Sequence, residues 1–163
     1  MVDLGSVLEV SYVDILLIVF LIYFVYRLFF KREEPLPPPP KVPPAMKKQD
    51  MTTEELKKYN GVDSEHICIA VLGTIYDVTR GKTFYGPGSA YENLAGHDAT
   101  RALANMDVKM VKDEYDDLSD LTPVDIDEAK GWADNFKFKY PTVGRLLKPG
   151  EKPNDYGDEL AKF

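Results

Sequence analysis

The stretch that decides the fold reads FYGPGSAY at residues 84–91 and AGHDATR at residues 95–101. Tyr85 and Tyr91 flank a Gly-Pro-Gly run that cannot continue a regular helix, so their six-residue spacing is that of a loop. The glycines let the backbone approach a flat ligand closely, and both tyrosines can point into one cavity. On spacing alone, paired tyrosines in such a loop are more often packing residues than cofactor residues.

A run that alternates aromatic and basic side chains, FKFKYP, occupies residues 136–141. Lys139 can pair with an anionic group, and Tyr140 can donate a hydrogen bond. Because a residue before proline is disfavoured in the helical region, we expect Tyr140 to turn away from the helix surface. Phe136 and Tyr140 also fit one buried helical face, which is the preferred interpretation for Phe136 and stays open for Tyr140.

The chain contains only two histidines, His66 and His97, and a single cysteine, Cys68. The cysteine count excludes an intrachain disulfide and a cysteine-based zinc cluster. His97 follows the loop and is the competing candidate for an iron ligand, although the adjacent Asp98 indicates a helix cap. We expect His66, beside the first predicted strand, to be a surface residue.

The formal net charge is −7, and it arises in residues 51–163, because acidic and basic residues balance in the first fifty. An acidic domain is poorly matched to a polyphosphate, so nucleic acid is not an expected partner. A basic or amphipathic protein partner fits this charge better.

Residues 13–30 are strongly apolar and predict a single transmembrane helix. Eighteen helical residues extend about 27 Å, close to the ~30 Å of a hydrocarbon core. Acidic residues precede this span and basic residues follow it, so we expect a short lumenal N-terminus at residues 1–12 and a cytosolic C-terminal domain. A cleaved signal peptide fits less well, because a basic leading region and a small-residue cleavage site are missing.

Prolines dominate residues 31–50 and predict a semi-rigid polyproline tether. A PxxP ligand for an SH3 or WW domain is the alternative role of this segment. At the other end of the chain, residues 153–163 are polar and acidic without periodicity, and we expect a mobile tail.

Between tether and tail, residues 51–152 predict one α+β domain with helices gathered at one end of a small sheet. A capping box at residues 52–55 begins a helix that we expect to run to about Tyr59. Two β-rich runs, residues 67–71 and 74–78, predict a hairpin. We further expect short helices at about residues 90–94, 99–105 and 108–112, and a longer helix at residues 123–138 that begins with proline.

Residues 52–150 resemble the membrane-associated progesterone receptor family, which comprises cytochrome b5-like haem/steroid-binding proteins. The motifs that carry the resemblance are FYGP at residues 84–87, Tyr91, AGHDATRALA at residues 95–104, KDEYDDL at residues 112–118, and FKY at residues 138–140 before Val143-Gly144. The apolar span and the proline-rich tether also resemble the anchored members of that family.

The resemblance implies a cytochrome b5-like fold that binds haem b, iron protoporphyrin IX. It implies Tyr91 as the single protein axial ligand of the haem iron, with Tyr85 hydrogen-bonded to that ligand and Lys139 and Tyr140 at the same haem. It further implies cytochromes P450 and steroids or sterols as partners, a haem-mediated homodimer, and a single-pass location in the endoplasmic reticulum membrane.

These observations favour a membrane-anchored haem-binding adaptor that supports cytochromes P450 and sterol or steroid metabolism. The alternative is a haem-free steroid-binding or protein-interaction module. A b5-type electron carrier is less favoured, because a hard phenolate oxygen prefers ferric iron and lowers the reduction potential. We do not expect an enzyme, because the sequence offers neither a nucleophile–base pattern nor an open metal triad.

Overall fold

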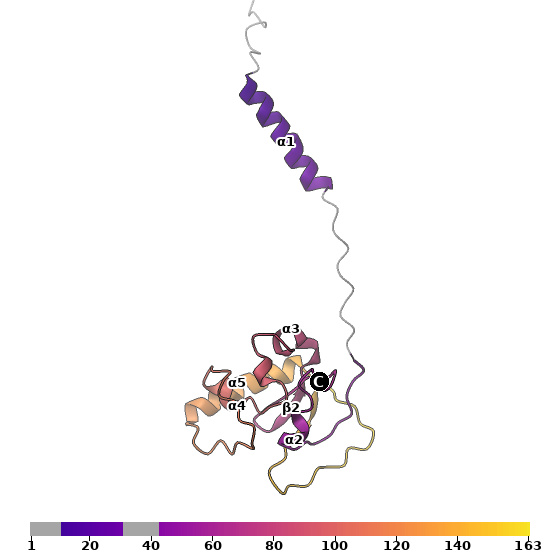
Figure 1. Cartoon of the computed structure of the whole chain (residues 1–163), viewed down its shortest axis with the longest axis vertical. Coiled ribbons are helices and arrows are strands. Elements are labelled where there is room, and N and C mark those ends of the chain that lie inside the picture. The colour runs from indigo at the N-terminus through magenta and orange to yellow at the C-terminus, as the bar shows by residue number, and fades with distance from the viewer. Residues whose placement is uncertain (1–10, 31–42) are drawn as a thin grey trace, which may run out of the picture. The chain divides into compact units, whose positions relative to one another are not determined.

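The computed structural model describes residues 11–30 and 43–163. The chain divides into two units, of which the first contains helix α1 (Tyr12–Phe30) and the second is the folded domain (Figure 1). The expected lumenal residues 1–12 and the first part of the expected tether, up to residue 42, lie almost entirely outside the described residues.

Helix α1 coincides with the apolar span expected at residues 13–30. Asp14 lies in its first turn and Arg27 in its last. Within the described parts of the chain, α1 is the one helix whose length and composition would allow it to cross a membrane. This finding rests on the length and composition of α1, and the membrane span stays a prediction.

The domain is built on an antiparallel sheet of three strands in the order β1-β2-β3. Strands β1 (Cys68–Val71) and β2 (Thr74–Asp77) form the predicted hairpin, whose turn places Leu72 and Gly73 at positive φ. Strand β3 (Thr142–Arg145) was not predicted. Its sequence, TVGR, ends in a glycine and an arginine and so lacks the β-rich pattern that marked the hairpin.

The helices differ from expectation mainly in length. Capping boxes begin both α2 (Thr53–Leu56) and α5 (Pro123–Lys139), but α2 ends three residues earlier than expected. The helix expected at residues 99–105 is α4 (Thr100–Ala104). The remaining short elements are α3 (Lys82–Tyr85) and two 3-10 turns, η2 (Thr79–Gly81) and η3 (Glu92–Leu94).

The helix expected at residues 108–112 does not form. Instead, the Asp107 carboxylate accepts the backbone N–H of Lys109 at 2.9 Å, a local bond that competes with helix hydrogen bonding. Val108 and Val111 nevertheless pack against the buried core, so the segment satisfies its apolar side chains without a helix.

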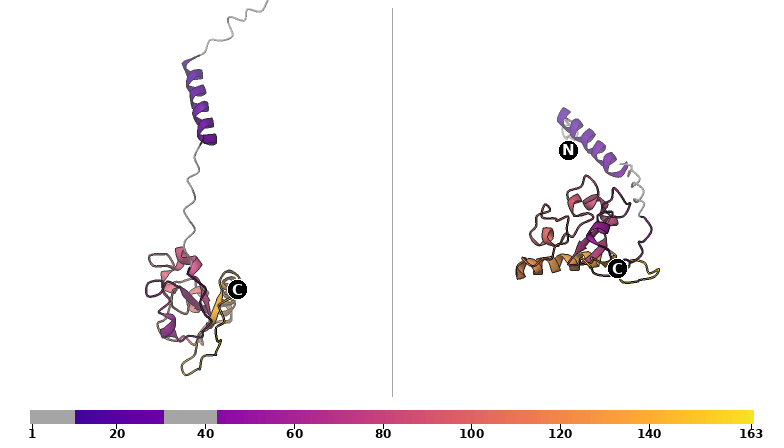
Figure 2. Two further views of the ribbon diagram at one scale, coloured as in Figure 1. Left: turned by 90° about the vertical axis from the view of Figure 1, so that its right-hand side faces the viewer. Right: turned by 60° about the horizontal axis from the view of Figure 1, so that its bottom comes forward.

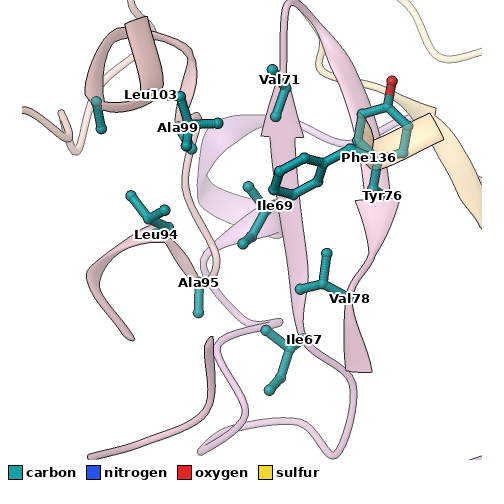
Figure 3. Close-up of a cluster of buried hydrophobic side chains, with 11 residues drawn as sticks. Ile67, Ile69, Val71, Tyr76, Val78, Leu94, Ala95, Ala99, Leu103 and Phe136 are labelled. Carbon is teal, nitrogen blue, oxygen red and sulfur yellow. The ribbon is translucent and has the colours of Figure 1, made fainter. Parts of the chain in front are cut away.

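Hydrophobic cores lie on both faces of the sheet, because successive side chains of a strand point in opposite directions. On one face, Ile69 and Val71 of β1 meet Phe136 of α5, with α4 packed against α5 (Figures 2 and 3). On the other face, the buried thiol of Cys68 and its strand neighbour Ala70 meet a cluster that includes Met46, Met51, Leu56, Ile75 and Val143.

The segment leading into the domain is part of the second core. Met46 is buried, and the backbone N–H of Gln49 donates to the carbonyl of Val143 at 3.0 Å. This crossing is so close that a Cβ at Gly144 would collide with the carbonyl oxygen of Gln49. The last residues of the expected tether therefore belong to the folded domain.

The C-terminal tail, which we expected to be mobile, folds back onto the same segment. Leu160 bridges to Lys47, and Lys162 bridges to Thr142 of β3. Ala161 is buried and donates its backbone N–H to the carbonyl of Met46 at 2.8 Å. This packing could not be predicted from local sequence, because the tail residues pair with partners that are about 20 or more than 100 positions away.

Asp50 holds these segments together. Its buried carboxylate accepts the Tyr156 hydroxyl at 2.7 Å and the backbone N–H groups of Arg145 and Asn154 at 2.8 and 2.9 Å. The Arg145 guanidinium lies 3.1 Å away. Burial alone would raise the pKa of this carboxyl, but the hydrogen bonds outweigh that effect and hold the pKa below its usual range.

We expect a fragment beginning at residue 51 to be much less stable than one beginning at residue 43. The shorter fragment loses buried Met46, the Asp50 carboxylate and the backbone pairing of the tail. Its free energy of unfolding in urea should be lower by about 3 kcal/mol or more. Equal unfolding midpoints for the two fragments would contradict this view of the domain boundary.

Asp50→Asn should weaken the domain at neutral pH and change its response to acid. A carboxyl whose folded pKa lies below the ordinary 3.8 stabilises the fold above that pH, and this stability is lost as the pH falls through the folded pKa. We expect a loss of about 1–3 kcal/mol at pH 7, and a flatter decline below about pH 4. Urea unfolding followed by Trp132 fluorescence measures both effects.

The matched control is Asp127→Asn, which removes an exposed carboxylate paired only with Lys130. It should change the free energy of unfolding by less than about 0.5 kcal/mol. If both variants behaved alike, Asp50 would not be the group that holds the tail.

Candidate functional site

Three of the four predicted site residues meet in one aromatic cluster. The ring of Tyr85 lies 6.3 Å from that of Tyr91 and 6.3 Å from that of Tyr140, measured between centroids. Phe136 contacts two of them, with its ring 6.1 Å from that of Tyr85 and 5.5 Å from that of Tyr140. Phe136 is buried in the core, as expected, while Tyr140 packs against that core and also contacts Tyr85.

The loop folds Tyr91 back toward Tyr85 through local hydrogen bonds. Helix α3 ends at Tyr85, because the following Gly86 adopts an extended conformation. The Ser89 hydroxyl contacts the carbonyl oxygens of Phe84 and Gly86 at 2.5 and 2.6 Å. The backbone N–H of Tyr91 then donates to the carbonyl of Phe84 at 3.1 Å, which closes the loop.

Tyr140 reaches the cluster because of the proline that follows it. Its φ of −130° and ψ of 144° are extended, as expected for a residue before proline. Its backbone N–H still donates to the carbonyl of Phe136 at 2.8 Å, so the chain leaves helix α5 at this residue.

Gly81 makes room for two of the tyrosines. A Cβ at this position would lie 2.9 Å from the Tyr140 hydroxyl oxygen and 3.1 Å from Cδ2 of Tyr85. The bare backbone of Gly81 therefore forms one wall of the cluster, a role that we did not predict.

Tyr85 and Tyr91 differ in exposure. Burial, followed by the neighbouring Tyr140 and Tyr91 phenols, raises the pKa of Tyr85, so this hydroxyl stays protonated and can donate. Tyr91 is 45% exposed, and none of the described residues forms a hydrogen bond with its hydroxyl. Tyr91 is thus the phenol of this cluster that is open to an incoming ligand.

Lys139 is the predicted site residue that the cluster does not include. It is the last residue of α5, and its side chain is exposed. Among the described residues, none is paired with its ammonium group, which leaves the charge available beside Tyr140.

Neither histidine belongs to the tyrosine cluster. The His97 ring lies with Nδ1 2.8 Å from the carbonyl oxygen of Ala95 and Nε2 3.4 Å from the Asp113 carboxylate. His66 is half-buried rather than superficial, with Nδ1 3.3 Å from the Asp77 carboxylate.

Asp98 is not the N-terminal cap of α4, contrary to expectation. The residue at the cap position is Ala99, which has no capping side chain. The Asp98 carboxylate instead accepts the backbone N–H of Thr100 at 3.0 Å and its hydroxyl at 2.5 Å.

A buried arginine joins α4 to the segment that follows it, and we predicted no role for it from the sequence. Arg101 of α4 holds the Asp116 carboxylate with two hydrogen bonds of 2.6 and 2.8 Å, and also binds Asp120. The guanidinium holds the pKa of Asp116 well below its usual range, although burial opposes this. The one signal in the sequence was a charged residue inside the otherwise apolar ATRALA helix.

The family model described as the cytochrome b5-like heme/steroid binding domain matches residues 52–146. Protein vem-1 of Caenorhabditis elegans is 48% identical over 96% of this chain and 85% of its own length. Human membrane-associated progesterone receptor component 2 is 49% identical over 70% of this chain, which corresponds to 54% of its own length. The cytochrome P450 regulator dap1 of Schizosaccharomyces pombe is 42% identical over 63% of this chain and 66% of its own.

A solved structure agrees with these relationships. An Arabidopsis thaliana protein described as having a cytochrome b5-like fold is 40% identical and covers 61% of this chain and 91% of its own, with a TM-score of 0.54. The fold expected from the sequence is therefore confirmed.

Gly81→Ala should disturb the cluster without straining the backbone, because Gly81 has an ordinary negative φ of −92°. The added methyl group must displace Tyr140 or Tyr85, at a cost of about 1–3 kcal/mol in the free energy of unfolding. Near-ultraviolet circular dichroism should report the altered tyrosine packing. The control is Gly131→Ala in α5, where nothing lies within 4 Å and stability should rise by up to about 1 kcal/mol.

Proposed function

The chain belongs to the cytochrome b5-like haem/steroid-binding family that includes the membrane-associated progesterone receptor components, and we propose that its domain binds haem b through Tyr91. The observation that carries this proposal is an exposed phenol, Tyr91, packed beside the ring of Tyr85, which in turn packs against Tyr140.

The residues present fit a haem group chemically. A phenol loses its proton readily when it binds ferric iron, and a hard anionic oxygen favours that oxidation state. Tyr91 has the exposure that such bonding requires, while Phe84, which is also exposed, adds an apolar surface next to Tyr85. Lys139 supplies a cation for a carboxylate of the ligand.

Each side chain has a distinct role in this proposal. Tyr91 would be the one protein side chain that holds the haem iron, through its phenol oxygen. Tyr85, whose raised pKa keeps it protonated, donates a hydrogen bond that orients the Tyr91 oxygen and tunes its basicity. Tyr140 and Lys139 contact the periphery of the ligand. When bound, the haem supplies a ferric centre of low reduction potential.

An electron carrier with two histidine ligands has no support in this arrangement, because both histidines have partners elsewhere in the domain. A steroid is the second candidate ligand. Its support is the exposed aromatic surface at Phe84 and Tyr91, together with an Arabidopsis relative named probable steroid-binding protein 3.

We further propose that the protein supports cytochromes P450 and sterol or steroid metabolism as a non-enzymatic adaptor. The fission yeast relative is named a cytochrome P450 regulator, and other relatives are named as receptor components or steroid-binding proteins rather than enzymes. Helix α1 supports a single-pass anchor. Location in the endoplasmic reticulum, a cytosolic domain and a haem-mediated homodimer complete the proposal.

Titration of the full-length protein with haemin should produce a high-spin ferric absorbance spectrum that is lost in Tyr91→Phe. The substitution removes only the hydroxyl oxygen, so the fold should persist by circular dichroism. Tyr115→Phe, which alters a tyrosine packed against the second core cluster, is the control and should bind normally. An unchanged spectrum in Tyr91→Phe would refute this ligand, and an unchanged spectrum on adding haemin to the wild type would favour the steroid alternative.

A further inference from the structure

We propose that the C-terminal residue, Phe163, forms part of the rim of the ligand site and contacts the flat ring system bound there. This inference rests on the proposed haem site at Tyr91. It assigns a binding role to a tail whose sequence has no recognisable motif.

The first observation is the position of the Phe163 ring. The guanidinium carbon of Arg80 lies 5.3 Å from the centre of this ring, a cation–π contact. Arg80 directly precedes Gly81, where an added Cβ would meet both Tyr140 and Tyr85. The terminal ring is therefore held by a residue adjacent to the wall of the tyrosine cluster.

The second observation is the path of the chain that brings Phe163 there. The backbone N–H of Thr142 donates to the carbonyl of Lys162 at 2.9 Å. Thr142 lies only two residues after Tyr140, so the last tail residues run beside the segment that places Tyr140 in the cluster.

The third observation is that the ring is held in place but not covered. Phe163 is 66% exposed despite its contact with Arg80. An exposed aromatic ring at a fixed position offers apolar area to a ligand at little entropic cost. Arg80, which is also exposed, adds a positive charge at the same edge for an anionic substituent of the ligand.

Asp50 and Tyr156 affect the proposed site indirectly, because they hold the tail in place. The Tyr156 hydroxyl donates to the buried Asp50 carboxylate at 2.7 Å, and Lys48 lies over the Tyr156 ring at 5.5 Å. These contacts fix the tail seven residues before its end. Tyr156 is thus a positioning residue for Phe163 and does not itself touch the ligand.

The first test compares haemin affinities of full-length variants. Phe163→Ala should bind haemin about five- to tenfold more weakly, as expected for the loss of one aromatic contact. Phe163→Tyr keeps the ring and should retain nearly the wild-type affinity. The control Val124→Ala shortens an exposed apolar side chain at the opposite end of α5 and should leave the affinity unchanged.

The second test uses hydrogen exchange rather than affinity. Haemin should slow exchange at the amides of Ala161 and Thr142, whose hydrogen bonds hold the tail in place. Tyr156→Phe should speed exchange at both amides without ligand and should also weaken haemin binding, because it loosens the tail while leaving Phe163 intact.

The outcomes separate this inference from the proposed function. If the wild-type protein binds haemin but Phe163→Ala binds equally well, and tail exchange is insensitive to haemin, the role of Phe163 is refuted and the Tyr91 site stands. If the wild-type protein does not bind haemin, the proposed site fails and the rim fails with it.

Discussion

The rest of the domain depends on one buried carboxylate. Asp50 accepts hydrogen bonds from β3 and, through Asn154 and Tyr156, from the tail, and so joins its own segment to two others that lie about a hundred residues further along the chain. Strand β3 follows directly on Tyr140. A buried charge is tolerated only when it is fully hydrogen-bonded, so these segments must be in place together. The packing of the second core and the position of Tyr140 are consequently linked.

The tyrosine cluster is assembled from loops, and a different local rule places each ring. Glycine and proline end α3 at Tyr85, backbone and serine hydrogen bonds return the chain at Tyr91, and a proline directs Tyr140. Phe136, within the buried core, contacts the rings of both Tyr85 and Tyr140. The cluster combines the accessible phenol of Tyr91 with the half-buried phenol of Tyr85. This arrangement suits a side chain that binds a ligand and a neighbour that orients it.

Features encoded by neighbouring residues could be predicted, and features that depend on distant pairing could not. The capping box of α2, the proline at the start of α5, the β1–β2 hairpin and the extended conformation of Tyr140 follow from local chemistry, and the structure contains all of them. Strand β3 and the folded tail exist only through long-range partners, so their sequences carry no periodic signal. His97 was a competing candidate for an iron ligand because it lies near the loop in sequence. Its ring contacts Asp113, a partner distant in sequence that local patterns do not reveal.

The pairing of the tail with residues 46–50 has a mechanical consequence. If the apolar helix α1 is fixed in a bilayer, any pulling force on the domain enters through the segment that contains Met46 and Asp50. That segment is bonded to β3 on one side and to the tail on the other. The load is therefore distributed across several hydrogen bonds, to β3 and to the tail, before it can reach the β1–β2 hairpin.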